Sequence, residues 1–295
     1  MDLFFMFRNY DKPGPGVRDD EPQKEGAALF FQTLGRKWKP MIRMNLIYIM
    51  YSIPMIIALF LLSGIVSSYM VNSNVTKQLI SDIAGSNGVI DAASYLRWQT
   101  ALDLSVRIFL TITGLMLFGS GPASAAMYAV HDCHMRGEPL WLWSDYNDFL
   151  RKNMKQGLIV AVIDLAFFFL LMTGYLVYGR INLFIDLRIV LTVILALYVM
   201  AHMYIYPMMA KYDLSIGALY RNAFIIAVGK LPQSALVLLI WLFMAAFPIL
   251  AVYIVPGVAV FCIMIYLLLA LIFTFSFMTL IAAVNARTQM NKVFK

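Results

Sequence analysis

Few residues of this sequence could do chemistry, and the two most unusual are ionisable side chains inside apolar segments. Asp164 and His202 each lie within a long hydrophobic run. An ionisable residue in a membrane-spanning helix usually faces the bundle interior and finds a polar partner there. We therefore expect Asp164 and His202 to contact each other. The pair either joins two helices, a role that Asp164→Asn would disturb little, or forms a site for a proton or a small ligand.

A second polar group, the sequence HDCH, brings His131, Asp132, Cys133 and His134 together within one helical turn. Adjacent residues on one turn cannot all point at one metal ion, so we predict no metal site there. The chain has only three histidines, and it contains no G-x-x-x-x-G-K-[ST], H-E-x-x-H, C-x-x-C or G-x-S-x-G sequence. We expect no metal, no cofactor and no enzymatic activity.

The stretch FGSGPASAAMYAV (118–130) concentrates small residues inside a hydrophobic segment. Pro122 has no N–H group, so the carbonyl group of Phe118 loses its helical partner, and Gly119 and Gly121 loosen the same turn. We predict a kink or local opening of the helix.

Small residues also recur four positions apart in this stretch, in the pairs Gly119/Ala123, Ser120/Ser124 and Gly121/Ala125. Such pairs indicate close helix packing; the alternative is that the kink lines a cavity. The residues expected to form the kink and its packing contacts are Gly119, Gly121, Pro122 and Ala125.

The spacing of the polar residues places several of them at one depth. Pro122, Asp164 and His202 each lie eight or nine residues from the same end of a predicted helix, which is about 12–14 Å at 1.5 Å per residue. Ser52 and Pro54 lie at a similar depth. The candidate polar site within the membrane therefore consists of Asp164, His202, Ser120 and Ser124.

The composition indicates what positions these residues. Apolar residues make up 62% of the chain and charged residues 13%, against about 45–50% and 25% in soluble domains. We predict an all-α, polytopic membrane protein in contact with the lipid bilayer, because helices satisfy their own backbone groups in lipid. Six transmembrane helices within a domain of residues 29–295 are expected at 44–71, 108–130, 157–178, 186–210, 232–255 and 257–284. Residues 1–28 form an N-terminal tail, and residues 72–107 an extracellular loop.

The distribution of positive charge predicts the orientation. The segments on the side of the two termini hold 18 Lys and Arg residues, and those on the other side hold five. The positive-inside rule places both termini in the cytoplasm. The net charge of +7 then reflects membrane topology, and the spread of the charges argues against nucleic-acid binding.

Three stretches that precede the first, third and fifth spans resemble one another. They are residues 29–43, 141–156 and 214–233, and each mixes aromatic residues and Leu with Arg or Lys. This composition is typical of a helix that lies in the membrane interface. We expect three units, each an interfacial helix followed by a helical hairpin. The second stretch is also a candidate docking surface for a partner, formed by Trp141, Trp143, Tyr146, Arg151 and Lys152. The alternative is an aromatic belt.

Three segments of the chain resemble the YesL-like family of bacterial multi-pass membrane proteins. They are GPASAAMYAV (121–130), FLRKNMKQG (149–157) and LYRNAFIIAVGKLPQS (219–234), and the resemblance extends from about Phe30 onward. It implies a multi-pass protein of the bacterial plasma membrane. Members of this family tend to be encoded beside oligosaccharide importers of the ATP-binding-cassette kind and beside sensor kinases. The family supplies no catalytic residues.

We therefore expect a non-catalytic membrane protein. The resemblance implies an accessory or regulatory subunit of an ATP-binding-cassette carbohydrate importer or its sensor, with the importer permease or a sensor kinase as the membrane-protein partner. The alternative is an independent small-solute transporter or channel that uses the polar site near Pro122, Asp164 and His202.

Overall fold

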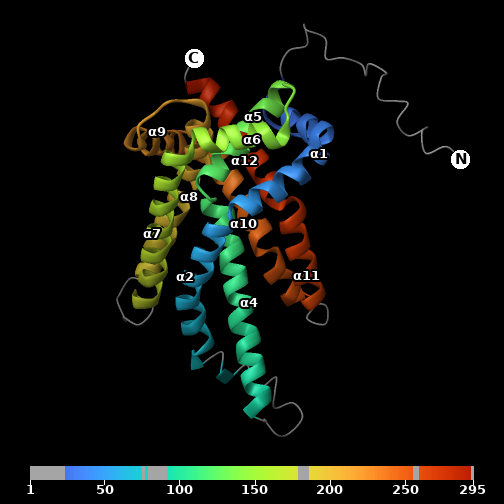
Figure 1. The fold of residues 1–295 in the computed structure, drawn as a ribbon. Coiled ribbons are helices and arrows are strands. Elements are labelled where there is room, and N and C mark those ends of the chain that lie inside the picture. The colour runs from blue at the N-terminus through green and yellow to red at the C-terminus, as the bar shows by residue number, and fades with distance from the viewer. Residues whose placement is uncertain (1–23, 75–76, 79–91, 179–185, 255–258, 294–295) are drawn as a thin grey trace, which may run out of the picture.

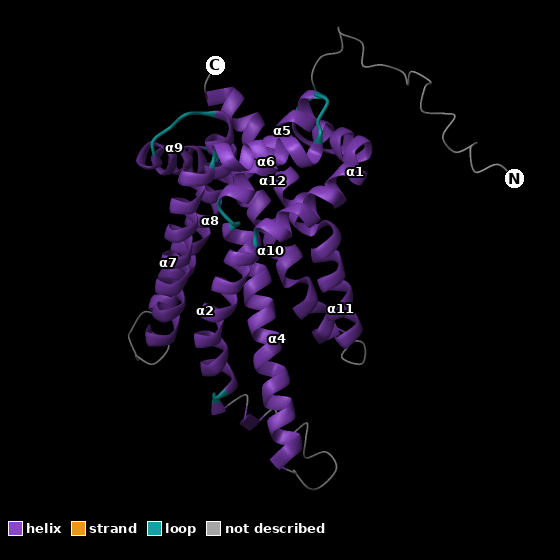
Figure 2. Cartoon of the chain, viewed as in Figure 1, coloured by secondary structure: helices purple, strands orange, loops and turns teal. Residues whose placement is uncertain are grey.

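The computed structural model describes residues 24–74, 77–78, 92–178, 186–254 and 259–293. Within these ranges every regular element is a helix, and none is a strand (Figure 2). Five helical segments are long and apolar enough to cross a membrane: Ile53–Val71, Tyr95–Phe118, Met154–Tyr178, Leu187–Lys211 and Met264–Asn291. A sixth is counted if Ile216–Gly229 and Leu231–Ala246, which are bent by 96° at their junction, form one span. The predicted all-α polytopic class is confirmed.

The spans extend in one direction from a layer of helices at one end of the molecule (Figure 1). Helix α2 (Ile53–Val71) packs along α4 (Ala92–Phe118), and α7 (Met154–Tyr178) packs against α8 (Leu187–Lys211). Helix α10 (Leu231–Ile254) contacts α11 (Ala259–Leu269) and α12 (Phe275–Val293). Their outward faces remain apolar and exposed, for example at Leu61, Leu170 and Leu239, as expected for surfaces in contact with lipid.

Four helices form the layer from which the spans extend, and we call them the helical cap. They are α1 (Gly26–Tyr51), α5 (Pro122–Arg136), α6 (Leu142–Lys152) and α9 (Ile216–Gly229) (Figure 1). Helix α5 is central, because it contacts α1, α6, α7, α8 and α12 and twelve of its fifteen residues are buried. This central position requires the small side chains that its sequence supplies.

Three cap helices lead into a span through a break of one residue. The breaks are at Ser52 between α1 and α2, at Asn153 between α6 and α7, and at Lys230 between α9 and α10. Pro54 helps to cause the first, because proline at the start of α2 cannot donate to the last turn of α1. The stretches 29–43, 141–156 and 214–233 therefore contain helices, as expected. Their threefold relationship and their position in a membrane remain predictions.

Two of the expected spans are broken, the second where a kink was predicted. The segment 44–71 divides at Ser52, so that residues 44–51 belong to the cap, and the segment 108–130 divides between Phe118 and Pro122. In both places a proline removes a backbone donor and the chain changes direction. The expected segments 157–178 and 186–210 agree with α7 and α8 to within a few residues, and 232–255 agrees with α10.

Residues 92–107 of the expected loop 72–107 are helical and form the first turns of α4. An ion pair of 2.8 Å between Asp103 and Arg107, four residues apart, supports this part of the helix. Residues 1–23 of the expected tail and the turn predicted around residue 256 lie outside the described residues. The sixth segment, 257–284, continues as helix to Val293.

Asn45 on α1 fastens the cap to the last span. A short π-helical turn, Ala270–Thr274, joins α11 to α12 and frees backbone groups from the regular pattern. The buried Asn45 amide donates to the carbonyl oxygens of Ala270 and Leu271, at 3.0 and 2.7 Å. Its Oδ1 accepts a hydrogen bond of 2.8 Å from the Ser276 N–H. One side chain therefore satisfies three backbone groups across two segments far apart in sequence.

Candidate functional site

The predicted distortion near Pro122 is a complete break between α4 and α5. Gly119 and Gly121 adopt positive φ angles of +73° and +68°, which glycine tolerates and other residues rarely adopt. Gly121 also lies directly against α7: a Cβ atom added to it would come within 2.5 Å of the carbonyl oxygen of Gly157. The small residues thus allow both the turn and the close approach of two helices.

Ala125, expected among the kink and packing residues of this stretch, packs in the core and lies beyond the distortion. It lies in the regular helix α5, beyond the break, and its N–H donates a hydrogen bond of 3.1 Å to the carbonyl oxygen of Gly121. The helical pattern has therefore resumed by this position. The side chain of Ala125 is fully buried in the hydrophobic core, so its small size serves the central packing of α5 and not the kink.

Tyr206 of α8 satisfies two of the backbone groups that the break leaves without helical partners. Its hydroxyl oxygen lies 3.0 Å from the carbonyl oxygen of Phe118, to which it donates. The same oxygen accepts a hydrogen bond of 3.0 Å from the Gly121 N–H. The N–H group of Ser120 donates to Ser124 Oγ at 2.8 Å. These three backbone groups of the break are therefore hydrogen-bonded within the protein, as a helix interruption away from water requires.

The carboxylate of Asp164 lies beside this break, fully buried. Its Oδ1 accepts a hydrogen bond of 2.6 Å from Tyr198, and its Oδ2 lies 3.0 Å from His202 Nε2. Tyr206 is also within reach, 3.3 Å from Oδ2. The expected contact between Asp164 and His202 is thus present. We call Asp164, Tyr198, His202 and Tyr206 the polar centre.

The two serines of the candidate site face other partners. Ser120 Oγ accepts a hydrogen bond of 2.7 Å from Ser52 Oγ, and Ser124 Oγ lies 3.4 Å from the hydroxyl of Tyr48. Both serines are buried. They connect α1 to the break from the side opposite the polar centre. Ser52, which we expected at the depth of Pro122, therefore contacts the break directly.

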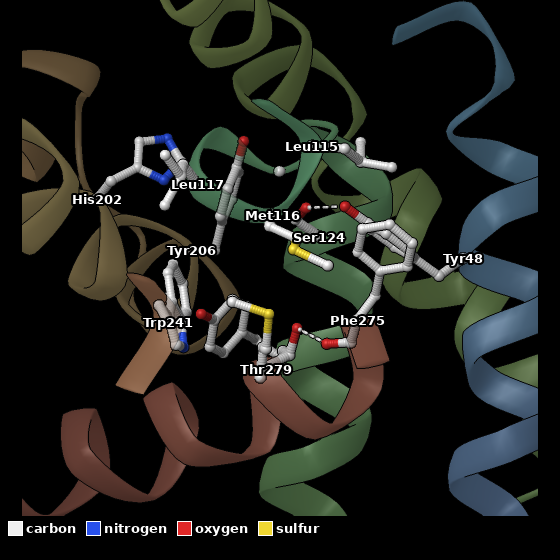
Figure 3. A pocket seen from close by; sticks show the side chains of 13 residues that line it. Tyr48, Leu115, Met116, Leu117, Ser124, His202, Tyr206, Trp241, Phe275 and Thr279 are labelled. Atoms are coloured by element: carbon white, nitrogen blue, oxygen red, sulfur yellow. Dashed lines mark hydrogen bonds between the residues drawn. The ribbon is translucent and has the colours of Figure 1, made fainter. Parts of the chain in front are cut away.

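A small cavity of about 20 Å³ lies between these two groups of contacts. Figure 3 shows His202 and Tyr206 on one side of it and Tyr48 and Phe275 on the other. Trp241 also lines the cavity, and its buried indole N–H has no hydrogen-bond partner in the protein. This volume is enough for about one water molecule. The small residues of the break therefore serve both expected purposes. Gly121 allows close packing against α7, and Gly119 and Ser124 line the cavity.

The candidate docking residues divide into an exposed group and one buried residue. Trp141 and Trp143 are 85% and 55% exposed, and Arg151 and Lys152 are also exposed. Tyr146 corrects the sequence-based expectation, because it is fully buried and donates a hydrogen bond of 2.8 Å to the carbonyl oxygen of Ala123. It holds α6 on the first turn of α5 and offers no surface to a partner.

The HDCH residues lie near the end of α5, beyond the span that ends at Phe118. His131 is fully buried and neither ring nitrogen has a hydrogen-bond partner. Burial and the neighbouring His134 lower the pKa of His131 to about 3. Among the described residues, no three His, Cys, Asp or Glu side chains are grouped so that they could hold a metal ion.

The two tyrosines of the polar centre were missed by the sequence analysis. Tyr198, His202 and Tyr206 recur every four residues and therefore share one face of α8. That spacing could have predicted from the sequence that both tyrosines lie beside His202. A tyrosine hydroxyl can donate to a buried carboxylate and still be accommodated by apolar neighbours.

The comparison with known families matches one part of the chain. Residues 106–175 match a family described as "Protein of unknown function, DUF624". The matched segment includes the break between α4 and α5, the whole of α6, and Asp164. YesL proteins contain this domain. No curated protein and no solved structure matches the chain.

Proposed function

We propose that this chain is a non-catalytic integral membrane protein that acts as an accessory or regulatory subunit of another membrane assembly. One observation carries the proposal: Asp164 inside the bundle is fully buried and bonded to side chains of α8, whereas aromatic residues on the cap are exposed. The first property suits a structural interior, and the second suits a docking surface.

The interior offers little room for a solute. Asp164 is fully buried and contacts three side chains of α8, and the adjacent cavity holds about 20 Å³. Pockets that bind small molecules usually measure about 300–1,000 Å³. The contacts of Asp164 therefore support a role in joining α7 to α8 near the break.

The cap offers a surface for a protein partner. Trp141 and Trp143 project at the start of α6, and Arg151 and Lys152 lie at its end. Tryptophan and arginine are enriched among residues that dominate binding energy at protein interfaces. Tyr146 fixes α6 to α5, so these side chains are presented by a helix that is already held in place.

The proposed partner is a permease subunit of an ATP-binding-cassette carbohydrate importer or a sensor kinase. This choice rests on the resemblance to YesL-like proteins, which also suggests the bacterial plasma membrane as the location. The charge asymmetry of the loops supports cytoplasmic termini. The cap would then face the cytoplasm, where the soluble subunits and kinase domains of such assemblies lie.

Co-purification at native expression level tests the proposal. The tagged chain is extracted in mild detergent, and permease subunits and sensor kinases are quantified by mass spectrometry. We expect enrichment of one of them, reduced several-fold by Trp141→Ala/Trp143→Ala. The control Val162→Ala/Leu170→Ala removes exposed apolar side chains from the span α7 and should retain the partner. A purely monomeric protein, or equal loss in both double variants, contradicts docking through α6.

An independent small-solute transporter is the second candidate, favoured by the ionisable Asp164–His202 pair beside the water-sized cavity. It requires the bundle to open further than the arrangement described here. Proteoliposomes that contain this protein alone test it by uptake of labelled sugars and by proton flux. Flux that Asp164→Asn abolishes without loss of assembly would establish the transporter and replace the docking proposal.

A further inference from the structure

A hollow of about 270 Å³ lies in the cap between α1 and the connection from α5 to α6. One wall comes from a single face of α1, because Lys37, Pro40 and Arg43 are spaced three residues apart. The backbone at Lys37 departs from helical geometry and Pro40 lies one turn later, so α1 bends at the hollow. The opposite wall is formed by His134, Leu140, Trp141 and Leu142.

The charged residues of this hollow are all basic. Its lining includes Lys37 and Arg43 but no carboxylate. Within the described residues, no acidic side chain forms an ion pair with either cation. Acids close in sequence to the second wall are engaged elsewhere: Asp132 and Glu138 pair with Arg136 at 3.5 and 3.1 Å, and Asp145 accepts a hydrogen bond from the backbone of Trp141. Two cations therefore face a concave surface without neutralisation by the protein.

His134 adds a third nitrogen-bearing side chain. It lines the hollow and is only 7% exposed, and its buried Nδ1 has no hydrogen-bond partner. Burial and the positive charge of Lys37 lower the pKa of His134 to about 4. The imidazole is therefore neutral at pH 7 and can donate one hydrogen bond. A buried polar group without a partner is unfavourable, and a bound anion would relieve it.

We propose that this hollow binds a phosphate group through Lys37, Arg43 and His134. The planar guanidinium of arginine matches phosphate oxygens with two parallel hydrogen bonds, and lysine is a common phosphate ligand. The neutral imidazole supplies one more donor without adding charge. Trp141 lines the hollow and also belongs to the proposed docking surface, but the three proposed phosphate ligands lie outside that surface.

Two sources of phosphate share this chemistry, namely the headgroup of an anionic phospholipid and a soluble phosphate compound. Phe31 and Trp38 on the same helix are 68% and 50% exposed, and exposed aromatic residues are typical of the headgroup level of a bilayer. The lipid source requires only that the hollow lie at that level. The soluble source requires access from the aqueous side.

The three histidines of the chain provide a direct readout. The full chain is labelled with isotopic histidine, and its three ring signals are assigned by substitution and followed by NMR. In detergent without phospholipid, inorganic phosphate and pyrophosphate are titrated. In nanodiscs, phosphatidylglycerol is compared with phosphatidylcholine. We expect the His134 signal to move and its pKa to rise by at least one unit when the anion binds, with little change at His202.

A matched pair of variants separates the site from general surface charge. Lys37→Gln/Arg43→Gln removes the cations of the hollow, and Arg36→Gln/Lys39→Gln removes the same charges from exposed positions of the same helix that do not line it. The first pair should weaken binding at least tenfold, and the second less than twofold. Thermal unfolding of both variants checks the fold.

The two arms identify the source of the phosphate. A response to soluble phosphate in detergent supports a soluble ligand, and a response only in phosphatidylglycerol nanodiscs supports a lipid headgroup. The proposal is overturned if His134 responds in neither arm or if both double variants weaken binding equally. This test replaces Lys37 and Arg43, whereas the co-purification test replaces Trp141 and Trp143, so the two sets of variants tell failure of one proposal from failure of the other.

Discussion

The hydroxyl group of Tyr206 lies 3.0 Å from the carbonyl oxygen of Phe118, the acceptor that Pro122 leaves without a helical donor. The same hydroxyl accepts from the N–H of Gly121. It also lies 3.3 Å from Asp164 Oδ2. One side chain of α8 thus stabilises the break in the central helix and connects it to the buried acid, so that the break and the polar centre form one hydrogen-bonded unit.

Substitution Tyr206→Phe tests this role. It should lower the free energy of unfolding by about 1–3 kcal/mol, because the buried Phe118 carbonyl and Gly121 N–H lose their partner while the ring remains. Thermal unfolding in nanodiscs measures the change. Tyr175→Phe is the matched control, because it removes a hydroxyl that bonds Thr192 at an exposed position of the span α7. Equal effects of the two substitutions would contradict a special role for Tyr206.

The contact between Gly121 and Gly157 gives a second prediction. Gly121→Ala places a Cβ atom 2.5 Å from the carbonyl oxygen of Gly157, at a φ angle of +68°. A non-glycine residue in such a conformation costs about 1–3 kcal/mol, and the contact with backbone cannot be relieved by moving a side chain. We expect a large fall in melting temperature and reduced yield of folded protein.

Gly217→Ala is the control for that substitution. No heavy atom lies within 4 Å of a Cβ added at Gly217, and the residue lies in helix α9. Alanine favours a helix over glycine by up to about 1 kcal/mol, so the variant should be as stable as the parent or slightly more stable. If Gly121→Ala behaves like Gly217→Ala, α5 does not approach α7 as closely as described.

The sequence predicted the break and the buried pair because each rests on a local rule. Proline lacks a donor wherever it occurs, and Asp164 and His202 stand out against apolar neighbours. Counting residues along two helices joined by a short connection then placed the pair at one depth. These arguments need only the rise of a helix and the properties of single side chains.

The sequence did not predict that the first apolar run divides at Ser52 or which aromatic side chains face inward. Hydropathy treats residues 44–51 and 53–71 alike, although the first group belongs to the cap and the second to a span. Tyr146 and Trp143 are both aromatic residues of the stretch 141–156 and look alike in the sequence. Only the fold shows that Tyr146 lies against Ala123. Such assignments depend on which helices are neighbours, and that is a tertiary property.

Two substitutions of Asp164 separate the contribution of its charge to stability from the contribution of its hydrogen bonds. Asp164→Asn keeps the size and one acceptor, so the loss of stability should be on the order of 1 kcal/mol. Asp164→Ala leaves the hydroxyl of Tyr198 and the ring of His202 without their partner and should cost about 3–5 kcal/mol. Unfolding of the two variants in nanodiscs measures both values.

A double-mutant cycle of Asp164→Asn with His202→Gln then isolates the coupling between the two side chains. A coupling energy of about 1 kcal/mol agrees with interhelical hydrogen bonds measured in other membrane proteins. Coupling near zero would mean that the 3.0 Å contact contributes nothing to the stability of the bundle. Normal stability of Asp164→Asn combined with loss of activity in cells would instead favour a functional site.

The buried His131 makes stability depend on pH. Its pKa falls from 6.5 to about 3 in the folded protein, because burial and the nearby His134 disfavour the charged ring. The unfolded chain therefore binds a proton between pH 6.5 and 3 that the folded chain excludes. The stabilisation is complete above pH 6.5 and is lost as the pH falls, by about 1 kcal/mol between pH 7.5 and 5.5 for this residue.

Thermal unfolding between pH 7.5 and 5.5 measures this dependence. His131→Gln removes the titrating group and should make the decline in melting temperature shallower, while His134, whose pKa is lowered to about 4, contributes a decline of similar size in both proteins. His131→Leu, which also removes the unpaired ring nitrogens, gives the same slope from a second substitution. An unchanged slope in both variants would show that His131 is accessible to protons in the folded protein.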